Sequence, residues 1–137
     1  MDGYSRLVVF LQASGNNRKD TVLGAFVRAT DIYKVPFRVC VDHGGENNLI
    51  CVIMELLRGP GRGSAIKCKS VHNQRIERAW VDVWNGATNV FYDIFDFLEQ
   101  RGSIDINNDE QLWALHYIFL PRVRLFLGIF VFIEIYT

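Results

Sequence analysis

Hydrophobic positions along the chain follow two different periods. Short runs rich in β-branched and aromatic residues predict strands at Leu7–Leu11, Phe37–Val41 and Ala65–Cys68. Apolar residues spaced three and four apart predict helices instead. These predicted helices span Asp20–Lys34, Asn47–Leu57, Asn73–Trp84 and Val90–Leu98, and Asn107, Asn108 or Asp109 caps a last one. Strands that alternate with helices favour an α/β fold with parallel crossovers, followed here by a helical C-terminal part.

The two ends of the chain break this pattern. The turn residues Asp2–Ser5 come immediately before the first predicted strand, and a strand that opens on a hairpin turn needs an earlier partner. We therefore expect the chain to begin partway through a sheet. At the other end, Leu125–Ile133 is the longest uncharged apolar stretch, and its composition predicts a β-prone, aggregation-prone tail. The stretch is far shorter than the roughly 20 residues that span a bilayer, so we expect no membrane association.

Composition narrows the class of protein. The 137 residues suit one domain, and 15 basic against 15 acidic residues argue against a strongly basic DNA-coating protein, although not against a local basic groove. Cys40, Cys51 and Cys68 are widely spaced without a C-x-x-C pair, which predicts reduced thiols in a nuclear or cytoplasmic, not secreted, protein. The three tryptophans, Trp80, Trp84 and Trp113, lie on apolar helical stripes and are expected in the core.

Two acidic residues stand where chemistry is expected. Asp42 follows the short strand that ends at Val41, and ligands of open α/β sheets gather at the carboxyl ends of strands. Glu77 lies in the first turns of a predicted helix, after a loop and a candidate strand that can return it beside Asp42. Such carboxylates hold Mg²⁺ for phosphodiester chemistry, although two ligands would be a partial set. The alternatives are a turn-capping Asp42 and a solvated Glu77.

Basic residues are concentrated around the second of these acids. The candidate nucleic-acid-binding residues are Arg62, Lys67, Lys69, Asn73, Arg75 and Arg78, and Arg58 extends the basic run. One interpretation is a track for DNA phosphates beside the site. The other is an ordinary solvated surface, and the sequence leaves both open.

Three segments in this order resemble one family. Asp42–Asn47 (DHGGEN) resembles the D-x-G-x-E/N turn of retroviral-type integrases, and His72–Arg78 resembles the segment with the third acidic residue of that family. Asp2–Arg6 followed by LVVFL resembles a strand hairpin of the same core. Together they resemble the integrase core domain, a ribonuclease-H-like fold of the DDE recombinase class. The resemblance implies a mixed sheet flanked by helices, Mg²⁺ or Mn²⁺ as cofactor, DNA as partner, and self-association into a homo-oligomer.

Carried over by position, Asp42 matches the second catalytic and metal-binding acid and Glu77 the third. The first acid of the family lies upstream of the DGYSR hairpin, so we expect an incomplete core. Residues 1–121 would be the integrase-core-like domain and residues 122–137 a divergent apolar tail. Asp2 is the only acid before the first predicted strand, and its place in a turn does not suit a metal ligand.

The expected protein is therefore a mobile-element remnant whose ancestral activity is metal-dependent DNA strand transfer and which is itself inactive. One alternative is a non-catalytic nucleic-acid-binding or protein-interaction module. Another is a fragment that does not fold stably, because missing strands would leave an exposed sheet edge.

Overall fold

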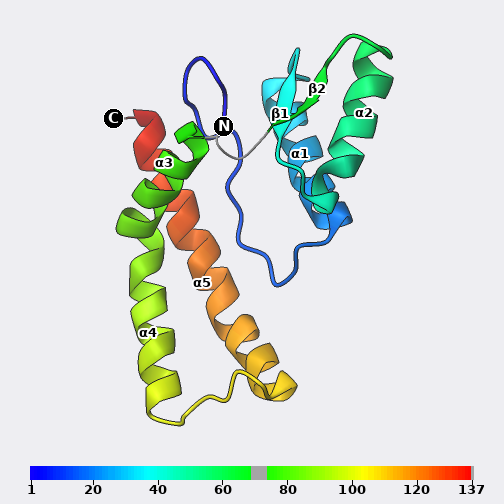
Figure 1. Cartoon of the computed structure of the whole chain (residues 1–137). Coiled ribbons are helices and arrows are strands. Elements are labelled where there is room, and N and C mark those ends of the chain that lie inside the picture. Colours follow the sequence, from blue (N-terminus) through cyan, green and yellow to red (C-terminus); the bar gives the residue numbers. More distant parts are fainter. Residues whose placement is uncertain (69–73, 137) are drawn as a thin grey trace. The chain divides into compact units, whose positions relative to one another are not determined.

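The computed structural model describes residues 1–68 and 74–136, which fall into two compact units. Met1 and Asn16–Glu77 form the first, called the α/β unit here. Asp2–Gly15 and Arg78–Thr137 form the second, called the helical unit. Figure 1 labels the α-helices and strands of both units.

The α/β unit alternates helices and strands as the sequence predicts. Its elements in chain order are α1 (Lys19–Tyr33), β1 (Val39–Val41), the 3-10 turn η1 (Gly45–Asn47), α2 (Asn48–Arg58) and β2 (Ala65–Lys67). The strands β1 and β2 pair in parallel, with Val39 opposite Ala65. The chain crosses between them through α2 (Figure 1). The predicted helix–strand order and parallel crossover are thereby confirmed, with boundaries that differ by at most two residues.

A small core closes the α/β unit. Met54 of α2 is fully buried at 0% exposure, and it packs in one cluster with Ile50 and with Phe26 of α1. Val39 of β1 and Ala65 of β2 border the same cluster. The apolar faces of α1 and α2 thus pack against the strand pair. This packing holds β1 and β2 in place, and with them the loop at their carboxyl ends.

The cysteines of the α/β unit differ from the sequence prediction. Cys40 and Cys68 form a disulfide, with their Cα atoms 5.9 Å apart, whereas Cys51 is free. The prediction of three reduced thiols is therefore wrong. The spacing of 28 residues gave no hint of the pair, because the two cysteines meet only once β1 and β2 have taken their register.

The helical unit is built around two long helices. The helix α3 (Gln74–Val83) runs into the π-helical turn η3 (Trp84–Thr88) and then into α4 (Asn89–Gln100). Gly102, with φ of 65°, helps to turn the chain after α4. The last helix, α5 (Asp109–Tyr136), returns alongside α4 (Figure 1). The helical C-terminal part is confirmed, but Leu125–Ile133 is helical, not β-structured.

Packing within the helical unit explains why its C-terminal tail is helical. Phe119 and Phe126 of α5 make edge-on ring contacts with Phe95 and Phe91 of α4, with ring centroids 5.1 and 5.2 Å apart. The next residue, Leu127, is buried against Ala87 of η3. Apolar residues at helical spacing therefore meet a helical partner, and this tertiary contact overrides the β propensity of the segment.

Two other predictions for the helical unit are wrong. Leu7–Leu11 is extended but pairs with no strand in the described part of the chain. Trp80, Trp84 and Trp113 are 57%, 44% and 67% exposed and so do not form a core. Leu11 instead packs beside the buried cluster of Val83, Ala87 and Leu127, which gives the N-terminal segment an apolar partner without a sheet.

The sheet and the helix α5 bear on the predicted mixed sheet and on the predicted absence of membrane association. Within residues 1–68 and 74–136 the sheet has two parallel strands, so a mixed sheet is not seen there. By length and composition alone, Asp109–Ile133 of α5 meets the requirement for crossing a membrane, as core helices of soluble proteins also do. The absence of membrane association stays a prediction, as do the domain limits at residues 121 and 122.

Candidate functional site

Asp42 lies directly after β1, at the carboxyl end of the strand pair, as predicted. Its Oδ1 accepts hydrogen bonds from the Asn47 side-chain amide at 2.5 Å and from the Gly44 backbone N–H at 3.4 Å. The carboxyl group is exposed, and Oδ2 accepts no hydrogen bond from the described residues. One oxygen therefore fixes the side chain to its own turn while the other stays open to a cation.

Gly44 of this turn is needed for the space that it leaves, not for an unusual backbone conformation. Gly44 has φ of −61°, which any residue can adopt. A Cβ at this position would overlap the carboxyl group of Glu46, which folds back over the glycine. Gly44 is therefore required here by the close approach of the Glu46 side chain, not by its backbone conformation.

Glu77 lies in the first turn of α3, as predicted. Its side chain is exposed, and the first turn of a helix is a favourable place for a carboxylate because the N-terminal dipole end is positive. The neighbouring Arg78 pairs with Asp82 at 3.7 Å rather than with Glu77. Lys69 and the side chain of Arg75 lie outside the described residues, so the availability of the Glu77 carboxylate for a ligand stays a prediction.

The chemistry of these side chains fits a divalent cation, although the ligand set is small. Carboxylate oxygens are the ligands that Mg²⁺ and Mn²⁺ prefer, and the Oδ2 of Asp42 has no hydrogen-bond donor among the described residues. Among residues 1–68 and 74–136, no group of three or more His, Cys, Asp or Glu side chains is placed to hold a metal ion. The convergence of Asp42 and Glu77 on one cation stays a prediction.

Asp2 can be assigned a structural role. Its Oδ2 accepts hydrogen bonds from the Ser5 hydroxyl and backbone N–H, both at 2.7 Å, and from the Tyr4 N–H at 3.1 Å. The hydroxyl and N–H of Ser5 are the main causes that lower the pKa of Asp2 below its ordinary value. Because its oxygen is engaged in this turn, Asp2 behaves as a turn cap, as its sequence position predicts.

The candidate basic residues have different surroundings. Arg62 is exposed in the loop after α2, and the Nζ of Lys67 donates to Asn48 Oδ1 at 2.8 Å. Arg78 is exposed and engaged with Asp82. Lys69 and Asn73 lie outside the described residues, as does the side chain of Arg75. The prediction of one phosphate-binding track therefore stays a prediction.

Arg58 has a structural role that the sequence did not reveal. Its guanidinium donates to the backbone carbonyls of Val35 and Pro36, at 2.5 and 3.1 Å, and lies 4.8 Å from the centre of the Phe37 ring. These bonds tie the end of α2 to the segment that leads into β1. The guanidinium of Arg58 is thus engaged within the protein, so Arg58 is a poorer candidate for contacting a DNA phosphate.

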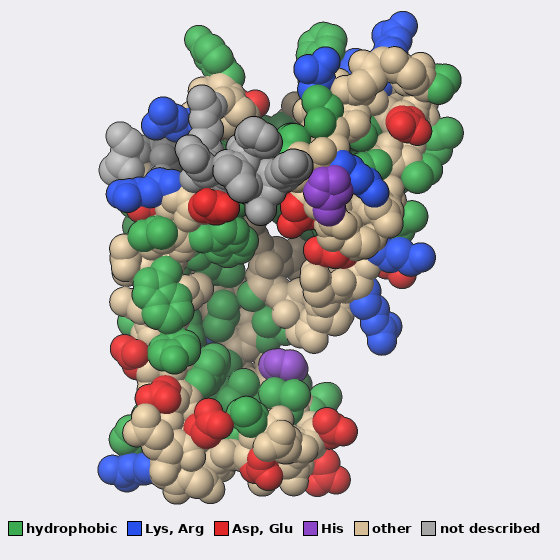
Figure 2. All heavy atoms as spheres, viewed as in Figure 1, with side chains coloured by type: hydrophobic (Ala, Val, Ile, Leu, Met, Phe, Trp, Pro, Cys, Tyr) green, Lys and Arg blue, Asp and Glu red, His purple; other side chains and the backbone are tan. Residues whose placement is uncertain are grey.

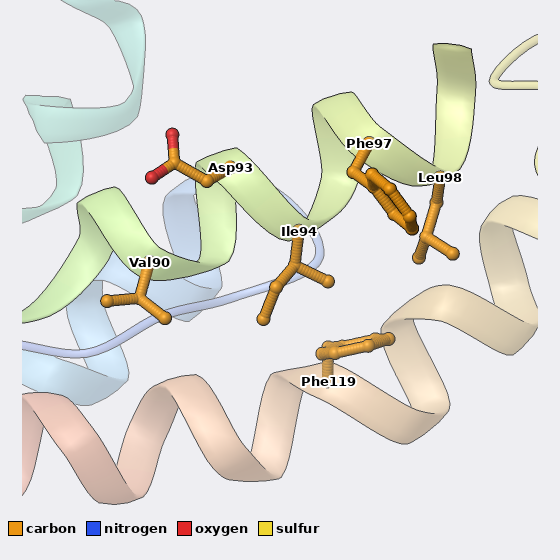
Figure 3. A pocket seen from close by; sticks show the side chains of 6 residues that line it. All are labelled: Val90, Asp93, Ile94, Phe97, Leu98 and Phe119. Atoms are coloured by element: carbon orange, nitrogen blue, oxygen red, sulfur yellow. The ribbon is translucent and has the colours of Figure 1, made fainter. Parts of the chain in front are cut away.

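The sequence analysis also missed a cavity in the helical unit. Its volume is about 580 Å³, and it is lined by Val90, Asp93, Ile94, Phe97 and Leu98 of α4 and Phe119 of α5. Figure 3 shows Ile94 and Phe119 facing each other across it. Apart from the Asp93 carboxylate the lining is apolar, so the cavity offers mainly shape and hydrophobic contact. No local sequence signal marked it, because it forms only when the two helices pair.

Asn47 is the site residue with the clearest missed role. It was included in the DHGGEN motif without an assigned function, yet it makes the short bond that orients Asp42. A side-chain amide five residues after a carboxylate, at the end of a glycine turn, is a signal that could have identified it.

Comparison with known proteins gives one match. The family model described as integrase core domain matches residues 1–132. No curated protein and no solved structure matches the chain significantly.

Proposed function

Because the chain belongs to the integrase core domain family, we propose that it descends from a metal-dependent DNA strand transferase of the DDE recombinase class, encoded by a mobile element. The observation that carries the proposal is the Asp42 carboxylate, which follows a parallel strand with one oxygen held by Asn47 and the other open. A ribonuclease-H-like fold is compatible with the parallel β1–α2–β2 crossover of the α/β unit.

In this proposal, Asp42 and Glu77 hold Mg²⁺ or Mn²⁺. The bond from Asn47 holds Asp42 Oδ1 in the turn and leaves Oδ2 as the oxygen that would bind a cation. In the ancestral reaction, a cation held there would stabilise the charge that develops on a phosphodiester. The basic residues Arg62 and Lys67 of the same unit contact DNA phosphates beside it.

We further propose that the chain itself does not catalyse strand transfer. Catalysis of this class uses a third carboxylate to bridge the metals, and Asp2 has its Oδ2 engaged by Ser5 and Tyr4. The expected property is binding of metal and DNA without phosphodiester cleavage.

Mn²⁺ titration followed by electron paramagnetic resonance tests the ligand assignment. Asp42→Asn and Glu77→Gln should each weaken binding about tenfold or more, because each removes a charged oxygen ligand. Asp31→Asn is a matched control, since Asp31 is exposed on α1 and has no part in the proposed site. Equal Mn²⁺ affinity in Asp42→Asn and Asp31→Asn would remove the metal proposal.

A nicking assay on duplex DNA with Mn²⁺ tests the inactivity. We expect no product above background. Robust nicking that Asp42→Asn abolishes would contradict the proposed inactivity and would support a working enzyme of the same family.

The alternative function is a non-catalytic nucleic-acid-binding module, and the exposed Arg62 and Lys67 favour it. Its test is duplex-DNA affinity measured against salt concentration. Replacing both residues with Ala should lower the affinity and reduce the log–log salt slope by about two, whereas Lys19→Ala in α1 should change neither as strongly. Absence of binding even at low salt would rule out this module and the DNA contacts of the main proposal.

A further inference from the structure

The disulfide of the α/β unit joins its two strands beside Asp42. The register pairs Val41 with Lys67, and the backbone N–H of Cys68 donates to the Val41 carbonyl at 2.7 Å. Cys68 therefore continues β2 at the level where β1 gives way to Asp42. Cys40 is the middle residue of β1 and lies two residues before Asp42.

The two cysteine residues are exposed to different degrees. Cys40 is exposed, and Cys68 is half-buried. Exposed disulfides are reduced and re-formed more readily than buried ones, and intracellular disulfides are mostly transient or redox-sensing. Cys51 of α2 is free, so a competing thiol lies in the same unit.

From this arrangement we propose that Cys40 and Cys68 form an oxidation-sensitive lock on the strand pair that carries Asp42. A low-molecular-weight disulfide such as oxidised glutathione is the oxidant. The Cys40 thiolate attacks it to form a mixed disulfide and releases one glutathione. The Cys68 sulfur then displaces the second glutathione, so the two protein thiols lose two electrons and their protons end on two glutathione thiols.

The lock acts on the short strand pair β1–β2, in addition to the backbone bond from Cys68 to Val41. β1 and β2 have three residues each, and the disulfide lies at the end from which the Asp42 turn departs. Closing the 28-residue separation lowers the entropy of the unfolded chain, so oxidation stabilises the α/β unit and reduction loosens it. The lock does not depend on metal binding, so it can be tested whether or not the proposed function holds.

Peptide mapping tests the pairing directly. Cleavage after glutamate separates the three cysteines, because Glu46 lies between Cys40 and Cys51, and Glu55 lies between Cys51 and Cys68. After treatment with oxidised glutathione, we expect a linked peptide pair that contains Cys40 and Cys68, with Cys51 open to alkylation. Separate alkylation of Cys40 and Cys68, or a link that uses Cys51, would overturn the proposal.

Thermal melting with and without reductant tests the lock. The oxidised chain should melt about 10 °C above the reduced chain, from the loop-closure effect on a unit of this size. Cys40→Ser and Cys68→Ser should each abolish the difference, and Cys51→Ser should keep it. If one of the first two variants fails to fold, the other still decides. Equal melting of oxidised and reduced protein, with the link present, would overturn the stabilising role.

Discussion

The α/β unit and the helical unit bury their hydrophobic side chains differently. In the α/β unit, residues of α1, α2, β1 and β2 pack together around the fully buried Met54. In the helical unit, α4 and α5 share one seam, while large side chains such as Trp113 and Tyr117 remain 67% and 71% exposed. Figure 2 shows hydrophobic side chains at the visible surface of the helical unit, over α4. A helix pair has only one shared face, whereas a strand crossover encloses its core.

This difference bears on function. The one carboxylate with a defined partner among the candidate ligands, Asp42, lies on the enclosed unit, where the strand ends are held by packing and by the disulfide. The helical unit carries the apolar cavity and the exposed aromatic residues but no comparable constellation among its described side chains. Precise positioning of polar groups needs the more rigid support.

The largest expected effect is the loss of the buried methionine. Met54→Ala should lower the free energy of unfolding of the α/β unit by about 3 kcal/mol, because it leaves a cavity between Phe26 and Ile50. Hydrogen exchange of the α2 amides reports on this unit, while tryptophan fluorescence reports on the helical unit, where all three tryptophans lie.

The matched control is Leu56→Ala, since Leu56 lies on the same helix but is 77% exposed. It should change the stability by no more than about 0.5 kcal/mol. Similar losses in both variants would contradict the view that Met54 closes a specific core.

The two units also differ in how much the sequence could predict. In the α/β unit, helix periodicity and strand composition are local signals, so α1, β1, α2 and β2 were found, and Asp42 was placed correctly after its strand. The Cys40–Cys68 pair was missed because it depends on strand register, which no local pattern specifies.

In the helical unit, the decisive contacts are between residues far apart in the sequence. The segment Leu125–Ile133 has a strand-like composition, yet Phe126 finds a ring partner on α4 and the segment becomes helical. Trp80 and Trp113 follow apolar stripes but have no partner element to bury them. A stripe predicts which face is apolar; what covers that face depends on the tertiary arrangement.

A pair of glycine substitutions tests the seam of the helical unit. A Cβ on Gly86 of η3 would approach the Phe130 ring to 2.8 Å, whereas one on Gly128 of α5 would meet open space. Gly86→Ala should therefore destabilise the helical unit by about 2 kcal/mol, because the ring of α5 must move away. Gly128→Ala should stabilise it by up to about 1 kcal/mol through helix propensity.

Denaturant unfolding monitored by tryptophan fluorescence measures both glycine variants. The exchange of α2 amides should be unchanged in each, since neither glycine belongs to the α/β unit. If Gly86→Ala proved neutral or stabilising, the close approach of α5 to η3 would be wrong.

The smallest expected effect concerns the Asp2 turn of the helical unit. The Ser5 hydroxyl is the largest cause of the lowered pKa of Asp2, so Ser5→Ala should raise that pKa toward 3.8. Because the folded-state pKa is the lower one, the turn contributes stability above the ordinary value of 3.8 and loses it as pH falls through the folded value. The variant should therefore show a weaker loss of turn structure on acidification.

Titration of the Asp2 carboxyl carbon by nuclear magnetic resonance measures this shift without relying on global stability. Ser103→Ala is the control, because Ser103 follows α4 and donates its backbone N–H to Leu98, away from the Asp2 turn in sequence. An Asp2 pKa that is the same in Ser5→Ala and in Ser103→Ala would show that the hydroxyl does not hold the carboxylate. The backbone N–H groups of Ser5 and Tyr4 would then be the bonds that hold Asp2 in its turn.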